Sequence, residues 1–273
     1  MAKKLFFLFL FTLFSFSSAF SDPLQPKRHE WDVAFQASYF RYEEPSLTVE
    51  DKGVLYGVSA AYTYHEGVTF SGDFRFSYGN VDYSSGNTGS LDNIEDYILE
   101  YRFWGGYDFV LDASPERTTL LTPYFGFGYR YLNDDSGGKT STTGALGYER
   151  ESNYFYSPIG LKTTLLYPNW SFELAAEYDI FWWGLQRSHL SDASPLLADI
   201  ENEQNDGYGV RGSLKVVRKL QNLSLFLEPY AIYWNIDKSE VSAVTTSSGY
   251  IIGVGWEPDN ESTEWGLKIG IRF

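Results

Sequence analysis

The last ten residues of the chain alternate strictly between apolar positions and positions that are polar or glycine. The apolar set is Trp265, Leu267, Ile269, Ile271 and Phe273, and the other set is Glu264, Gly266, Lys268, Gly270 and Arg272. Successive side chains of a β-strand point to opposite faces, so this segment would have one apolar face and one charged face. The pattern predicts a strand that crosses a membrane, with one face toward lipid and the other toward a wet lumen.

The same alternation recurs in ten segments of the chain. They are 31–43, 53–65, 68–83, 94–111, 119–132, 147–166, 169–187, 207–219, 223–239 and 263–273. The connections at 65–67, 112–117, 167–169 and 220–222 are short, whereas those between them are longer and polar. Short turns at one end, long loops at the other and an even strand number are typical of membrane barrels. We therefore predict an all-β protein, an antiparallel up-and-down transmembrane β-barrel of ten strands.

The N-terminal residues have a different character. Lys3 and Lys4 precede an apolar stretch at 5–16, and small residues follow. This is the pattern of a secretory signal peptide, which we predict at 1–21 and expect to be removed. The stretch is shorter than the roughly twenty apolar residues that a helical anchor needs. The remainder, 22–273, is predicted to be a single barrel domain.

Composition and charge narrow the possible functions. Aromatic residues make up 19% of the chain, which suits a barrel whose tyrosines and tryptophans gather at the membrane interfaces. The net charge is −15, and no basic patch is present that would neutralise a run of phosphates. A nucleic-acid partner is therefore not expected. Cysteine is absent, so no disulfide is involved.

A chain that ends on such a strand, with a terminal phenylalanine, resembles the outer-membrane β-barrel proteins of Gram-negative bacteria, with an omptin-like or small-porin-like architecture. The resemblance implies a location in the cell outer membrane and contact with outer-membrane lipid and lipopolysaccharide. It also implies recognition by the barrel-assembly machinery through the strand that ends at Phe273. It implies neither an activity nor an oligomeric state.

The predicted register places charged side chains of both signs inside the barrel. They are Asp32, Asp73, Arg75, Glu100, Arg102, Asp108, Arg130, Lys162, Glu173, Glu177, Asp179, Arg211, Lys215, Glu228, Glu264, Lys268 and Arg272. A ten-stranded cylinder is narrower than the sixteen-stranded barrels that hold an open aqueous channel. We therefore expect ion pairs to fill the lumen. The alternative is a narrow selective pore lined by facing rows of charge.

The outer connections are where a functional site is expected. They are 44–52, 84–93, 133–146, 188–206 and 240–262, of which the last two are the longest. Loop 188–206 contains the only histidine predicted on the outer side, His189, because neither His29 nor His65 is placed there. We treat this loop as the candidate site.

Three residues of this loop would suit acyl transfer. His189, Ser191 and Glu201 supply a base, a hydroxyl nucleophile and an orienting carboxylate. Their order is similar to the His-x-Ser…Glu arrangement of the outer-membrane lipid A deacylases. In this sequence Asp192 stands where those enzymes would have an asparagine, and those enzymes are smaller barrels.

Ten strands with tall loops also resemble the omptin proteases, which activate water between an aspartate pair and a histidine–aspartate pair. Asp92 and Asp96 are four residues apart, about 13 Å along a strand, which is too far for their carboxylates to share a water. Arg187 stands two residues before His189, where an aspartate would be expected. Asp199 lies nearby, but spacing alone assigns it no role.

The acidic clusters at 134–135, 199–206 and 257–261 lack the spacing of a calcium-binding loop, and they are predicted to be hydrated surface. No cofactor and no metal site is predicted. The sequence therefore favours a non-enzymatic outer-membrane barrel with a structural, adhesive or narrow porin-like role. The alternative is a surface hydrolase centred on His189, either omptin-like or lipid A deacylase-like.

Overall fold

The computed structural model describes residues 23–273, so the predicted signal peptide at 1–21 lies outside the described residues. The strands are β1 (His29–Glu44), β2 (Val49–Glu66), β3 (Val68–Ser85), β4 (Gly89–Tyr107), β5 (Phe109–Ala113), β6 (Thr118–Asp135), β7 (Glu149–Leu166), β8 (Trp170–Ser188), β9 (Ile200–Gln204), β10 (Gly207–Lys219), β11 (Ser224–Ile236), β12 (Ser242–Thr245), β13 (Ile251–Gly255) and β14 (Asn260–Arg272). The helix α1 (Leu190–Ala193) is a single turn. Between residues 23 and 273, no helix is both long enough and apolar enough to span a membrane.

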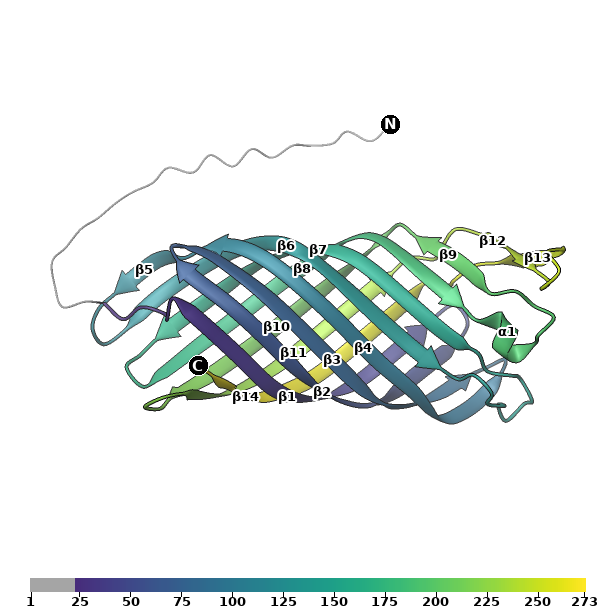
Figure 1. Cartoon of the computed structure of the whole chain (residues 1–273), viewed down its shortest axis with the longest axis horizontal. Helices are drawn as coiled ribbons and strands as arrows, with labels where there is room; N and C mark the ends of the chain where they lie inside the picture. Colours follow the sequence, from purple (N-terminus) through teal and green to yellow (C-terminus); the bar gives the residue numbers. More distant parts are fainter. Residues whose placement is uncertain (1–22) are drawn as a thin grey trace, which may run out of the picture.

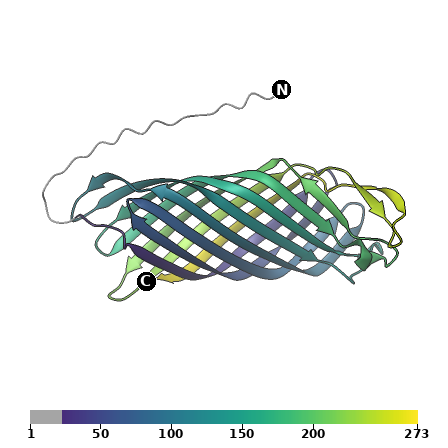
Figure 2. The same cartoon turned by 45° about the horizontal axis from the view of Figure 1, so that its top comes forward.

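The strands close into a cylinder (Figure 1). The large sheet has 12 strands, and ten of them form the wall in the order β1-β2-β3-β4-β6-β7-β8-β10-β11-β14, each antiparallel to its neighbours. The wall closes because β14 also pairs with β1, with Asp32 opposite Arg272 and Tyr39 opposite Trp265. The predicted antiparallel barrel of ten strands is therefore confirmed. Figure 2 shows the strands crossing the cylinder obliquely, with the C-terminus and the start of β1 at the same end.

The strands are longer than predicted at the end away from the C-terminus and the start of β1, which we call the outer end. The predicted outer loops 44–52 and 84–93 are wrong, because β1 and β2 continue until only 45–48 connect them, and β3 and β4 until only 86–88 do. The outward positions there are polar, for example Glu50 and Lys52, while Val49 points inward and is buried. Because the phase of the alternation is inverted in this part, the apolar-outward pattern did not reveal it.

The remaining outer connections also contain structure. Loop 188–206 carries α1 and β9, and β9 pairs with the end of β8. The segment predicted as loop 240–262 holds the hairpin β12–β13, and its last residues already belong to β14. At the inner end, the predicted continuous strand 94–111 is divided by Asp108 into β4 and β5.

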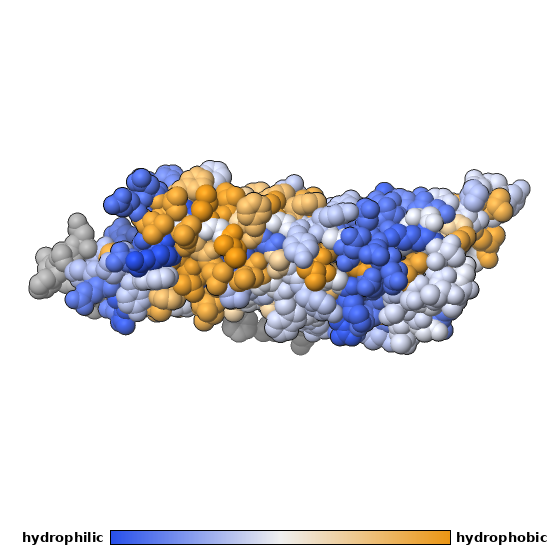
Figure 3. Space-filling model, turned by 90° about the horizontal axis from the view of Figure 1, so that it is seen from below, coloured by the Kyte–Doolittle hydropathy of each residue, from blue (hydrophilic) through white to orange (hydrophobic). Residues whose placement is uncertain are grey.

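An apolar band covers the half of the barrel next to the C-terminus on the face that Figure 3 shows, and exposed apolar side chains on all ten wall strands continue it around the barrel. Its largest exposed side chains include Phe35 at 77%, Phe103 at 65% and Trp265 at 63%. Exposed aromatic and aliphatic residues in such number are unfavourable in water and suit contact with acyl chains. Toward the outer end the surface becomes hydrophilic, which marks where the wall leaves the apolar region.

Candidate functional site

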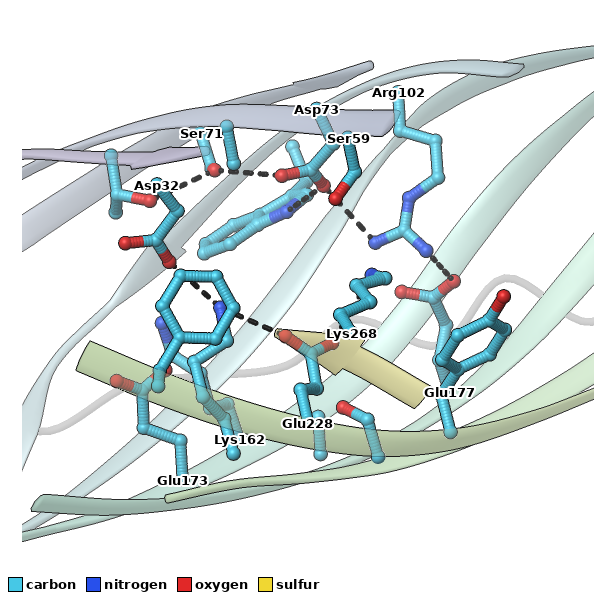
Figure 4. A pocket seen from close by; sticks show the side chains of 18 of the residues that line it. Asp32, Ser59, Ser71, Asp73, Arg102, Lys162, Glu173, Glu177, Glu228 and Lys268 are labelled. Atoms are coloured by element: carbon cyan, nitrogen blue, oxygen red, sulfur yellow. Dashed lines mark hydrogen bonds and ion pairs between the residues drawn. The ribbon is translucent and has the colours of Figure 1, made fainter. Parts of the chain in front are cut away.

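The lumen of the inner half is filled with ion pairs. Every charged residue predicted to point inward is buried or half-buried, which confirms the register. Figure 4 shows Arg102 between Asp73 and Glu177, which come from different strands of the wall. Arg102 Nη1 donates to Glu177 at 3.0 Å and Nη2 donates to Asp73 at 3.2 Å. These side chains therefore cross-link the wall from inside.

The ion pairs nearest the inner end lie beside the C-terminus and the start of β1. Arg272 Nε and Nη2 donate to the two carboxylate oxygens of Asp32 at 2.7 and 2.8 Å, and Arg272 also contacts Glu173. Lys215 Nζ lies 2.7 Å from Asp32 and 3.1 Å from Glu228. Each acid therefore has a basic partner, as a desolvated carboxylate requires.

Farther outward, Glu100 joins several elements. It accepts hydrogen bonds from Arg75 Nε at 3.1 Å, from Arg211 Nη2 at 2.8 Å and from the Tyr156 hydroxyl at 2.7 Å. Tyr156 itself lies over Gly128 of the neighbouring strand, where a Cβ atom would be 2.2 Å from the ring. Only glycine leaves room for the ring at this position, so Gly128 allows the Tyr156 side chain to lie inside the lumen.

An apolar layer lies beyond the charged layer. It consists of two clusters of buried side chains, which are Phe40, Tyr42, Leu55, Val81, Ile94, Ile98 and Leu132, and Tyr154, Tyr156, Phe181, Tyr230, Ile232, Trp234 and Ile236. The Arg130 guanidinium lies 5.7 Å from the ring centre of Tyr154 and 5.8 Å from that of Trp234. The middle of the barrel is therefore packed in the manner of a protein core.

Cavities remain on both sides of this layer. The inner cavity, of about 190 Å³, is lined by the charged residues of Figure 4. The cavity at the outer mouth measures about 370 Å³ and is lined by residues near the strand ends and by loop residues. The two cavities have no lining residue in common. This arrangement supports the prediction of a filled lumen over that of a selective pore.

The outer mouth is acidic, and sequence reasoning missed its composition. Arg150 Nη2 donates to Glu44 at 2.7 Å and contacts Glu257, and it lies 3.1 Å from the Tyr42 hydroxyl. Burial raises the pKa of Glu257, and the neighbouring Glu44 carboxylate adds to this, whereas the charge of Arg150 opposes it. Glu44 and Arg150 were not recognised as lumenal because they lie beyond the segment where the apolar positions face outward.

His189 lies outside this mouth cavity, although its neighbours Ser188 and Leu190 line it. Its Nδ1 is 3.2 Å from Asp199 Oδ2, and its Nε2 is 3.3 Å from Glu151 Oε1. Partial burial tends to lower the pKa of His189, but the hydrogen bond to Glu151 and the charge of Asp199 outweigh it and raise that pKa. The imidazole is thus held between two carboxylates.

The other candidate residues of this loop have different partners. The Ser191 hydroxyl donates to Asp199 Oδ1 at 2.7 Å. Glu201 accepts from Arg187 Nε at 2.9 Å. The structure therefore brings His189 together with Asp199 and Glu151, and its hydrogen bonds do not assemble the predicted His189–Ser191–Glu201 triad. Ser191 orients Asp199 rather than facing the histidine as a nucleophile.

The aspartates considered for a protease site are also separated by their surroundings. Asp92 is exposed at the rim, whereas Asp96 is 1% exposed and lies opposite Asp134 in the register of β4 and β6. Asp96 and Asp134, with Asp51, belong to the acidic interior of the mouth. These contacts therefore do not place an aspartate pair beside His189 at a solvent-accessible position.

The closed cylinder, the apolar band and the charged interior define the class of the fold, which is the outer-membrane β-barrel. No family model matches the chain, and no curated protein matches it in sequence. Among solved structures it is similar to the outer membrane protease OmpT from Escherichia coli, at 9% identity over 93% of this chain and 98% of that chain, with a TM-score of 0.59.

Two other similar structures are more distant. The translocator domain of autotransporter NalP from Neisseria meningitidis has a TM-score of 0.38 at 12% identity, over 89% of this chain and 88% of that chain. The attachment invasion locus protein Ail of Yersinia pestis has a TM-score of 0.34 at 13% identity, over 90% and 99%. The likeness to OmpT shows the fold alone, and this fold agrees with the predicted location in the cell outer membrane.

Proposed function

We propose that this protein is an integral outer-membrane barrel that does not conduct ions and works without covalent chemistry, in a structural or adhesive role at the cell surface. The observation that carries the proposal is the packed lumen. An ion that crossed it would have to break the pairs around Glu100 and then enter the apolar layer around Leu55 and Trp234. Separating such pairs and dehydrating an ion each cost several kcal/mol, and apolar constrictions close pores by excluding water.

The adhesive role is supported by the outer end of the molecule. The hairpin β12–β13 lies at the outer end of the barrel, away from the C-terminus (Figure 1). It exposes Tyr250 at 74%, Ile251 at 71% and Val254 at 62%, well away from the apolar band. Apolar side chains that gather on a surface in water mark sites of interaction. A surface of this kind suits contact with another macromolecule.

The proposed partners follow from the outer surface of the wall and from the seam, which is the pairing of β1 with β14 that closes the barrel. The apolar band would contact outer-membrane lipid, and the hydrophilic wall above it would contact lipopolysaccharide. At the seam, Phe273 and Trp31 exchange backbone hydrogen bonds, both of 3.0 Å. A terminal strand that completes the wall in this way suits recognition by the barrel-assembly machinery before closure.

Planar-bilayer recording tests the absence of conduction. The refolded mature chain is expected to insert without stable conductance steps, because the two cavities share no lining residue and packed apolar clusters fill the middle of the barrel. An open porin added afterwards to the same bilayer serves as the positive control. Steady, reproducible open events from the protein alone would contradict the proposal and restore the narrow porin-like alternative.

The surface-hydrolase alternative retains one favourable observation, the contact of His189 with Asp199. The refolded protein and the His189→Ala variant are assayed for lipid A deacylation and for cleavage of basic peptides, with Ser191→Ala as a second variant. We expect no activity that depends on His189. Loss of a robust activity in His189→Ala would support an omptin-like enzyme, and loss in both variants would support a deacylase-like enzyme.

A further inference from the structure

We propose that Glu149, Glu151 and His189 form a binding site for one divalent transition-metal ion, for which Zn²⁺ is the reference. The site lies on the outside of the wall near its outer end. It goes beyond the proposed function, because it concerns neither conduction nor adhesion.

The pairing of two strands creates this cluster. Glu149 and Glu151 are two positions apart at the beginning of β7, so their side chains share one face. His189 follows the last residue of β8. The register places Arg150 opposite Ser188, and the His189 backbone N–H donates to the Glu149 carbonyl at 2.9 Å. The histidine is thereby brought to Glu151, although 38 residues separate them.

The distances suit a metal ion. One ligand atom from each of the three side chains can be chosen so that all lie within 4.8 Å of one another. His189 Nε2 and Glu151 Oε1 are 3.3 Å apart. In a tetrahedral zinc site with bonds of 2.0 to 2.1 Å, two ligand atoms are also about 3.3 Å apart. All three residues are half-buried, so solvent can supply the fourth ligand.

Residues outside the three ligands hold them in place. Asp199 Oδ2 lies 3.2 Å from Nδ1 of His189, which directs Nε2 toward the two glutamates. Asn133 Nδ2 donates to Glu149 Oε1 at 2.7 Å. A histidine that bonds a carboxylate through one nitrogen and a metal through the other is a common arrangement in metal sites. Asp199 and Asn133 are therefore assigned as positioning residues.

The donor set indicates which ions would bind. Two carboxylates and a neutral imidazole carry a charge of −2, which matches a divalent cation, and imidazole favours zinc, copper or nickel over calcium and magnesium. Zinc binds the neutral imidazole, so metal binding would release any proton that His189 Nε2 carries to solvent. Arg187, at 3.9 Å from Glu151, is directed mainly to Glu201.

Zinc titration of the refolded protein without a polyhistidine tag tests the site. Calorimetry in detergent should give one Zn²⁺ per barrel. His189→Ala and Glu149→Gln should each weaken binding at least about tenfold, and Asp199→Asn about ten- to hundredfold, since loss of an orienting partner has that effect. Co²⁺ should give the visible absorption of tetrahedral coordination, and His189→Ala should abolish it.

Matched controls separate this site from unspecific binding. Glu203→Gln removes an exposed carboxylate of β9, and His29→Ala removes a histidine at the other end of the barrel. Both should keep the affinity of the unmodified protein, and the heat-modifiable band in gel electrophoresis confirms that each variant is folded. No saturable zinc binding, or binding that both His189→Ala and Glu149→Gln leave intact, would overturn the proposal.

Discussion

The two halves of the barrel wall use the same alternation with opposite polarity. In the inner half, Phe103 faces outward and Glu100 faces the lumen. In the outer half, Asn80 and Asp82 face outward, whereas Val81 between them is fully buried inside. The surroundings of each half explain the difference, because lipid favours an apolar exterior and water a polar one. One continuous strand can therefore cross lipid in one half and stand in water in the other, because its apolar residues change from the outward face to the inward face.

The inversion explains how the wall rises beyond the membrane. A tilted strand needs about 9 to 11 residues to span hydrocarbon. β3 has 18 residues and β4 has 19. The excess forms a cylinder in water, and its apolar interior stabilises it as a core stabilises a soluble protein. On β4, Ile98 and Glu100 are adjacent inward positions and mark the border between the two kinds of interior.

The largest expected effect tests the charged interior. Glu100→Gln removes a charge that Arg75 and Arg211 share, and leaves both buried guanidiniums short of a partner. Loss of one member of a buried pair costs about 3 to 5 kcal/mol. Urea titration, with folded protein read from the heat-modifiable band, should show this loss. Glu95→Gln, exposed on the same strand, should change stability by less than about 0.5 kcal/mol. Equal stability of the two variants would mean that the pairs do not hold the inner half together.

The next effect tests the apolar interior. Ile98 is 0% exposed and belongs to the cluster of the apolar layer that also contains Leu55 and Val81. Ile98→Ala should cost about 2 to 5 kcal/mol in the same titration, because it leaves a cavity in a packed region. Leu47→Ala, in the exposed turn between β1 and β2, is the control and should cost far less. A wet, loosely filled outer lumen would instead make Ile98→Ala nearly neutral.

The same inversion determines how much of the fold could be predicted. The inner half was predicted correctly, including the inward direction of Glu100 and Arg272, because its apolar side chains face outward as in other membrane strands. The sequence pattern predicts loops at the outer ends of β2 and β4, within 44–52 and 84–93, because outward Lys52 and Asp92 look like loop residues in a sequence. The apolar layer inside the barrel was missed for a related reason. Without the register, inward apolar residues such as Val81 and Leu55 cannot be distinguished from residues that face lipid.

The candidate site was predicted less well. His189 was singled out because it is the only histidine expected near the outer end. Its motif partners, Ser191 and Glu201, were chosen by order in the sequence, whereas the partners in the structure are Asp199 and Glu151. Glu151 lies on another strand, and only the pairing of β7 with β8 brings it close. Such contacts depend on register to within one residue, which a single sequence does not provide.

The last prediction compares the two exteriors directly by placing the same cation on each. Phe103→Arg puts a guanidinium on the apolar band, and Asn80→Arg puts one on the polar wall of the adjacent strand β3. A basic residue that faces lipid near the midplane costs about 2 to 4 kcal/mol, and the cost falls toward zero at the interfaces. Folding into vesicles should therefore be weakened by Phe103→Arg, and Asn80→Arg should lie within about 0.5 kcal/mol of the unmodified protein. If both substitutions were costly, the polar outer wall would also lie in hydrocarbon, and the boundary between the two halves would have to be moved outward.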